Sequence, residues 1–140
     1  MLRRSLLVLA ALCGASIAHG QKPGGDPIPA GVPALTGRAA QESAPAQAFA
    51  ALLKAAAKND FAAIRPMLVE NHPGMRLLNP TEFPAVRTEL LPNRASPTAV
   101  MATLSELYIK GDDATLVFDA EPGQTIWKMK RLAGAWKLSP

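Results

Sequence analysis

Cysteine is almost absent from this 140-residue chain, and the single one, Cys13, lies in an N-terminal segment that we expect to be removed. The remaining chain would have no thiol, which excludes disulfide bonds, thiolate metal sites and cysteine nucleophiles. Histidine is nearly as rare, because removal of His19 with the same segment leaves only His72. With no histidine pair, no calcium-loop spacing and no glycine-rich phosphate loop, the sequence predicts neither a bound metal nor a cofactor.

An excess of charge of one sign is also missing. The formal net charge is +4, and without Arg3 and Arg4 the remaining 13 basic residues face 11 acidic ones, which leaves +2. A nucleic-acid-binding domain concentrates basic charge on one face. A net charge of +2 provides too little excess of basic residues for such a face, so we expect no nucleic-acid partner.

Long apolar runs are confined to the N-terminus. The basic start at Met1–Arg4 is followed by an apolar run from Leu6 to Leu12, and small residues stand at Ala18 and Gly20. This order is typical of a secretory signal peptide cleaved after residue 20. The run is shorter than the roughly 18 to 20 residues that span a bilayer. We therefore expect an exported soluble protein, in the periplasm or outside the cell, without stable membrane insertion.

Proline and glycine are dense in the next segment. Between Gln21 and Pro45 there are five prolines and four glycines. Such a stretch buries too little apolar surface to offset the entropy lost on ordering. We expect residues 21–42 to form a flexible linker and residues 43–140 to form one domain.

Apolar periodicity predicts helices in the first half of that domain. They are expected at about residues 43–58, 61–68 and 82–91. The first helix carries Phe49, Leu52 and Leu53 on one face. Asp60 and Thr81 are the expected N-terminal caps of the second and third helices.

In the second half of the domain, apolar and polar residues alternate as they do in β-strands. Strands are expected at about residues 99–110, 114–120, 125–132 and 135–138, with turn residues between them. Residues 99–110 also fit a helix, but the hairpins that follow favour a strand. The sequence therefore predicts an α+β domain whose N-terminal helices pack on a curved antiparallel sheet, formed by a four-stranded C-terminal meander.

Two segments resemble a known family. Phe49–Asp60 is similar to the first helix and following break of nuclear transport factor two-like proteins, although Asn59 stands where glycine is usual. Trp127–Leu138, with its Gly134-Ala135-Trp136-Lys137 sequence, looks like the closing hairpin of small exported members. The resemblance implies the cystatin-like α+β roll. That fold hosts isomerases, dehydratases, carrier domains and modules of unknown role, so it does not select a function.

Candidates for acid–base chemistry are few. An enzyme resembling the isomerases or dehydratases of this fold would need a desolvated acid–base group in the pocket between helices and sheet. Asp119 is the candidate carboxylate and Tyr108 the candidate donor to an oxyanion, although a solvated strand end and a packed aromatic are the plainer interpretations. His72 is expected in a solvated turn at Asn71–Gly74.

Apolar side chains offer another kind of site. Phe49, Leu53, Trp127 and Met129 either line a ligand pocket or fill the core. The basic residues Lys128, Lys130, Arg131 and Lys137 are expected on a solvated sheet face.

The favoured hypothesis is a non-enzymatic binding or interaction module of the cell envelope. Its partner would be a small apolar ligand or an envelope protein, and a homodimer is left open. The alternative is a small isomerase- or dehydratase-like enzyme that uses a pocket carboxylate.

Overall fold

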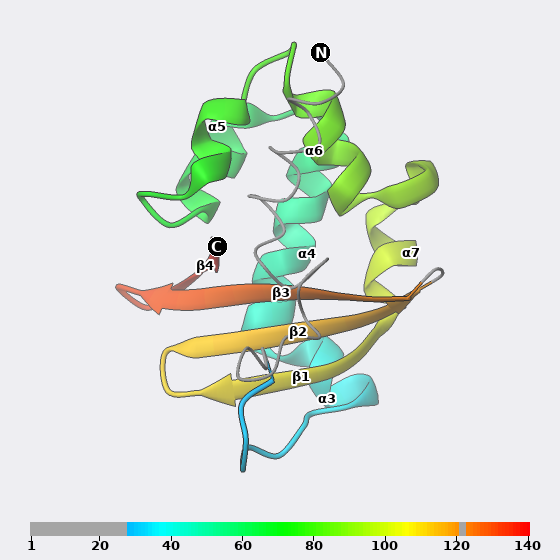
Figure 1. The fold of residues 1–140 in the computed structure, drawn as a ribbon, viewed down its shortest axis with the longest axis vertical. Coiled ribbons are helices and arrows are strands. Elements are labelled where there is room, and N and C mark those ends of the chain that lie inside the picture. Colours follow the sequence, from blue (N-terminus) through cyan, green and yellow to red (C-terminus); the bar gives the residue numbers. More distant parts are fainter. Residues whose placement is uncertain (1–27, 121–122) are drawn as a thin grey trace.

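A computed structural model describes residues 28–120 and 123–140 of the chain. These residues form an α+β arrangement in which helices pack against a four-stranded antiparallel sheet (Figure 1). The predicted α+β class is confirmed. The expected signal peptide and residues 21–27 of the expected linker lie outside the described residues.

The helical elements precede the sheet in the chain. They are α3 (Gly37–Glu42), α4 (Ala44–Ala57), α5 (Phe61–Ile64), η1 (Arg65–Met67), η2 (Pro73–Leu77), α6 (Phe83–Leu90), η3 (Pro92–Arg94) and α7 (Pro97–Met101), where η marks a 3-10 helix. The long helix α4 begins after Ser43, whose hydroxyl accepts a hydrogen bond from the Ala46 amide. Pro45 is tolerated in its first turn because the N–H groups there have no partner within the helix. The predicted helix over 43–58 is confirmed.

The caps of the later helices agree only in part with the prediction. Asp60 caps α5, with its carboxylate oxygen accepting from the Ala63 amide at 3.2 Å. The predicted cap Thr81 is wrong, because the N-cap residue of α6 is Glu82, whose side chain forms no capping hydrogen bond, and Asn79 instead holds the turn before it. The Asn79 side-chain oxygen accepts from the amides of Thr81 at 3.0 Å and Glu82 at 2.9 Å. An asparagine can bond the backbone two residues ahead, and this contact positions the chain for α6.

The sheet is a meander in the order β1-β2-β3-β4. Its strands are β1 (Leu104–Lys110), β2 (Asp113–Ala120), β3 (Gly123–Leu132) and β4 (Ala135–Ser139). In the register, Leu116 of β2 lies opposite Leu107 of β1 and Trp127 of β3. Because side chains alternate across a strand, Phe118 and Trp127 share the face of Leu116.

Residues 99–110 contain the end of a helix and then a strand, the two structures that the sequence pattern allowed. Ser96 caps α7 by accepting from the Ala99 amide at 3.1 Å, and β1 begins only at Leu104. The prediction of one strand over 99–110 is therefore wrong in its first part. A cap followed by Pro97, whose fixed φ suits the first turn of a helix, is enough to start α7.

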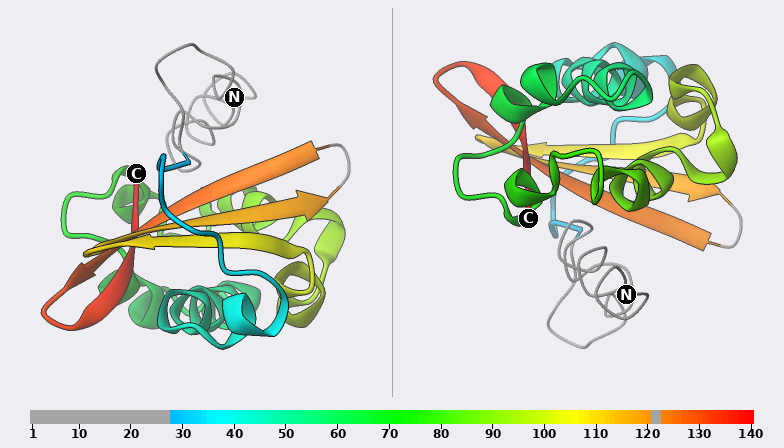
Figure 2. Two further views of the ribbon diagram at one scale, coloured as in Figure 1. Left: turned by 90° about the horizontal axis from the view of Figure 1, so that it is seen from below. Right: turned by 90° about the horizontal axis from the view of Figure 1, so that it is seen from above.

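The segment before α4 is joined to the domain. Leu35 forms an antiparallel bridge with Leu107, in which the Leu35 amide donates to the Leu107 carbonyl at 2.8 Å and the Leu107 amide donates to the Leu35 carbonyl at 2.9 Å. Figure 2 shows the segment that leads into α3 passing beside β1. Ala40 of α3 is fully buried. The sequence predicts a linker through residue 42, whereas residues 35–42 pack on β1. The edge of β1 offers unpaired backbone groups, which an extended segment can satisfy.

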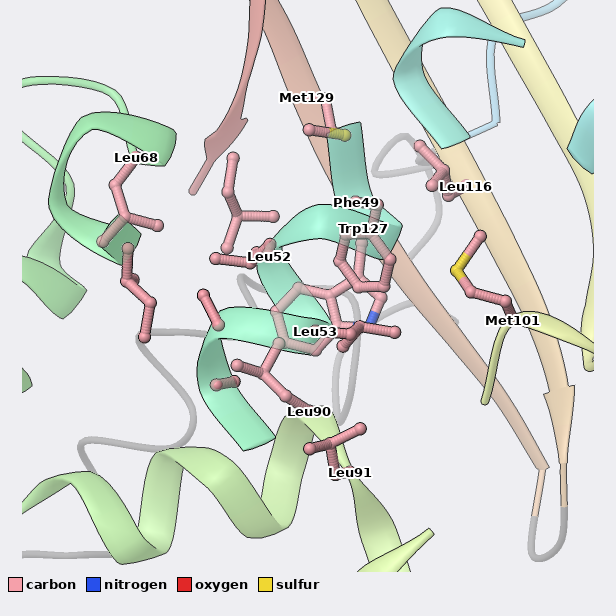
Figure 3. Packing of buried hydrophobic residues seen from close by; sticks show 14 of the residues in the cluster. Phe49, Leu52, Leu53, Leu68, Leu90, Leu91, Met101, Leu116, Trp127 and Met129 are labelled. Carbon is pink, nitrogen blue, oxygen red and sulfur yellow. The ribbon is translucent and has the colours of Figure 1, made fainter. Parts of the chain in front are cut away.

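The core lies between α4 and the sheet (Figure 3). The Phe49 ring is fully buried, and its centroid lies 5.2 Å from that of Phe118 and 5.7 Å from that of Trp127. Both contacts are tilted, a geometry that aromatic pairs favour over face-to-face stacking. This triad joins α4 to the middle of the sheet.

Candidate functional site

A cavity of about 300 Å³ opens between the segment from α6 to α7 and the strands β2 and β3. Its apolar lining consists of Leu90, Pro92, Ala95, Ala99, Val100, Phe118 and Trp127, and its polar lining of Glu89, Asn93, Thr103 and Thr125. A mainly apolar lining with a few polar groups is characteristic of small-molecule sites, and this volume is at the lower end of their range.

Strands β2 and β3 build one wall of the cavity. Phe118 and Thr125 are cross-strand partners, and Trp127 follows Thr125 on the same face. Phe118 and Trp127 are almost fully buried and are held from behind by Phe49. The aromatic wall is therefore fixed by the core before any ligand arrives, which lowers the entropy that binding would cost.

The opposite rim carries backbone strain. In η3, Asn93 has φ 56° and ψ 29°, and Arg94 has φ 58°. Two consecutive non-glycine residues in the left-handed region are uncommon, and each such residue costs on the order of 1–3 kcal/mol. Asparagine tolerates this conformation better than arginine does. Strain of this kind clusters at ligand sites, and here it borders the cavity.

The four residues predicted from sequence to line a pocket occupy different places. Trp127 borders the cavity, and Phe49 lies directly behind it (Figure 3). Leu53 and Met129 are buried in the core cluster. The structure thus brings Phe49 and Trp127 together beside the cavity, whereas Leu53 and Met129 lie in the core and do not line the cavity.

The two predicted acid–base candidates lie on the other face of the sheet. Tyr108 pairs with Thr115 and Asp119 with Gln124, and these positions alternate with the inward residues Leu116 and Phe118. The Tyr108 hydroxyl hydrogen-bonds to the Glu106 carboxylate. Asp119 is exposed, and its amide donates to the Thr103 carbonyl at 2.9 Å.

The carboxylate that does line the cavity is that of Glu89, which was not among the acid–base candidates predicted from the sequence. It is half-buried on α6, three residues after the buried Val86. Residues three apart are neighbours on a helix surface. The three-residue spacing from Val86 is the one feature of the sequence that predicts Glu89 at the border of the apolar face of α6.

His72 differs from its expected setting. The prediction of a solvated turn is wrong, because its side chain is only 2% exposed. Nδ1 accepts a hydrogen bond from the Gly74 amide at 2.8 Å, while Nε2 has no hydrogen-bond partner among the described residues. Burial lowers the pKa of His72 from 6.5 to about 4, because desolvation disfavours the charged imidazolium.

The basic residues predicted on a solvated sheet face lie at the surface. Arg131 pairs with Asp112 at 2.8 Å, and its guanidinium lies 5.5 Å from the ring centroid of Trp136. Lys128 and Lys130 are exposed as predicted, while Lys137 is half-buried. In residues 28–120 and 123–140, no three His, Cys, Asp or Glu side chains are grouped to hold a metal ion.

Among the helices that the structure describes, none combines the length and the apolar character needed to cross a membrane.

Comparison of this chain with known protein families, curated proteins and solved structures finds no match.

Proposed function

We propose that this protein is an exported binding module of the cystatin-like α+β roll class, and that the cavity beside Trp127 holds a small, mainly apolar molecule. The observation that carries the proposal is the position of Trp127, which is anchored in the core by Phe49 and also borders the cavity. The order of helices followed by a four-stranded meander supports the roll class.

The cavity lining favours an apolar ligand. Seven of its eleven lining residues are apolar, and two of those are aromatic. Covering apolar surface is worth about 25 cal/mol per Å². The Thr103 hydroxyl already donates to the Val100 carbonyl at 2.7 Å, so its proton is engaged within the protein. Most of the binding energy would therefore come from contact with the apolar wall.

The enzyme alternative has one observation in its favour. Glu89 lines the cavity, so it could supply the pocket carboxylate that an isomerase or dehydratase needs. Asp119 is poorly placed for that role, since it lies on the opposite face. Binding remains the first proposal because the aromatic wall supports it without requiring a substrate or a second reacting group.

Ligand binding can be tested with the uncharged fluorophore N-phenyl-1-naphthylamine. Because the chain has two tryptophans, Trp136→Phe leaves Trp127 as the only indole. We expect saturable binding that quenches Trp127 emission. Ala99→Phe, which fills part of the cavity, should weaken binding by about tenfold or more.

The matched control is Ala62→Phe, an exposed alanine of α5 that should leave the affinity unchanged. The proposal fails if the fluorophore does not bind, or if Ala99→Phe binds it as tightly as the parent does.

Export is tested separately from binding. Intact-mass measurement on protein recovered from the periplasm or the medium should show a chain that begins at Gln21. Recovery of the full-length chain in those fractions would contradict the signal peptide proposal.

A further inference from the structure

A second hollow adjoins the cavity. It is an open groove of about 600 Å³, lined by Ala57, Pro84, Arg87, Thr88, Leu91, Asn93, Arg94 and Ala95. Asn93 and Ala95 line both hollows, so both border η3 and the residue that follows it. The two hollows differ in chemistry, because one has an aromatic wall and the other carries two guanidinium groups.

Both arginines of the groove keep their charge available. Within residues 28–120 and 123–140, the ion pairs are Arg38–Glu42 and Arg131–Asp112, and neither involves Arg87 or Arg94. None of the described residues that line the groove is acidic. The described side chains that line the groove therefore carry positive charge only.

Arg87 is positioned by a neutral group. Its Nη1 donates to the side-chain oxygen of Asn59 at 3.0 Å. Asn59 ends the turn after α4 with φ 53°, another left-handed residue. An amide oxygen restrains the guanidinium without neutralising it, and the other N–H groups of Arg87 stay available for an anion.

Arg94 is held at the groove by the strained turn of η3. It follows Asn93 in the left-handed region, which is unusual for an arginine. The same turn contributes Asn93 to the apolar cavity and Arg94 to the groove. One local conformation thus forms the boundary between the two hollows.

We infer that the two hollows form one site for an amphipathic carboxylate, with its short apolar chain beside Trp127 and its carboxylate between Arg87 and Arg94. This inference rests on the proposed function and extends it to a ligand class. Guanidinium groups bind carboxylates through charge-assisted hydrogen bonds.

The test compares three ligands that share a ten-carbon chain: decanoate, 1-decanol and decyltrimethylammonium. Each is titrated into the Trp136→Phe protein while Trp127 emission is followed. We expect decanoate to bind at least about tenfold more tightly than decanol, and the cation to bind most weakly. Added salt should reduce the advantage of decanoate and leave decanol unaffected.

Variants assign the charge preference to the groove. Arg87→Gln and Arg94→Gln should each weaken decanoate binding by about tenfold and leave decanol binding unchanged. The control Arg76→Gln, an exposed arginine of η2, should alter neither. Because decanol reports on the cavity in every variant, a misfolded protein is recognised by loss of decanol binding, and the ligand series on the parent stands independently.

The outcomes separate the two proposals. Equal binding of decanol and decanoate overturns the inference about an anionic group and leaves the apolar site intact. An unchanged decanoate affinity in both folded arginine variants also overturns it. Failure of decanoate to bind to a protein that still binds the fluorophore overturns the inference alone, whereas failure of the fluorophore and of all three ligands overturns the proposed function as well.

Discussion

Nδ1 of His72 accepts a hydrogen bond from the Gly74 amide at 2.8 Å, inside the domain and out of contact with water. This contact requires the neutral imidazole, because a protonated ring has no acceptor nitrogen. In the neutral ring the proton then resides on Nε2, a buried donor without a partner among the described residues. Protonation would add a buried charge and break the contact to Gly74.

The first prediction is therefore a loss of stability in mild acid. The pKa of His72 is about 4 in the folded protein and near 6.5 in the unfolded chain, so the unfolded chain binds the proton first as the pH falls. His72 should leave the free energy of unfolding unchanged above pH 6.5 and lower it progressively towards pH 4. The total loss should be about 3 kcal/mol. Urea unfolding at several pH values measures it.

His72→Asn is the control for that experiment. Asparagine can also accept a hydrogen bond from a backbone amide two residues ahead, but it does not titrate. The variant should begin less stable and should lose less stability between pH 6.5 and 4 than the parent does. Parallel pH profiles for the two proteins would contradict the assignment to His72.

The second prediction concerns the aromatic triad. Phe49→Ala removes a fully buried ring that contacts both Phe118 and Trp127. We expect the free energy of unfolding to fall by about 3–5 kcal/mol, because apolar contact is lost and a void remains. Denaturant unfolding measures the change. Lys54→Ala, at an exposed position of the same helix, should change it by less than about 0.5 kcal/mol.

The third prediction concerns the turn between β3 and β4. Ala133 has φ 51° and Gly134 has φ 80°, which is the conformation of a two-residue hairpin turn that favours Asn-Gly. Ala133→Asn should raise the free energy of unfolding by about 0.5–1 kcal/mol, because asparagine adopts the left-handed region more readily than alanine. Ala135→Asn, placed in a strand, should not stabilise the protein. Thermal unfolding of both variants is the measurement.

The fourth prediction concerns the segment before α3. Limited digestion with a protease of low specificity should leave a resistant fragment that begins before Leu35, because Leu35 is bridged to Leu107. Leu35→Pro removes the N–H that donates to the Leu107 carbonyl at 2.8 Å. The fragment of that variant should begin nearer Ser43. Ala34→Pro, at an exposed neighbour, is the control, and a parent fragment that begins at Ser43 would refute the bridge.

Several elements follow from local sequence. The stripe that contains Phe49 predicts α4, because side chains three and four residues apart share one face of a helix. Alternation around Leu116 and Trp127, with turn residues between the runs, predicts the hairpins of the sheet. These features depend on residues close in the chain, so a single sequence is enough to recognise them.

Other features depend on contacts between distant segments. Pro73 and Gly74 are typical of an exposed turn, yet the packing of that turn buries His72. Leu35 lies in a stretch whose composition favours a linker, and only the free edge of β1 gives it a backbone partner.

The candidate site shows the same division. Trp127 could be proposed from sequence as an aromatic side chain facing the helices, but its cavity exists because α6, η3 and α7 close over β2 and β3. Helix α6 places Glu89 in the lining of that cavity and Arg87 in the lining of the adjoining groove, and the turn at Asn93 and Arg94 borders both hollows. Periodicity within one element determines which face is buried, whereas the shape left between elements depends on how all of them pack.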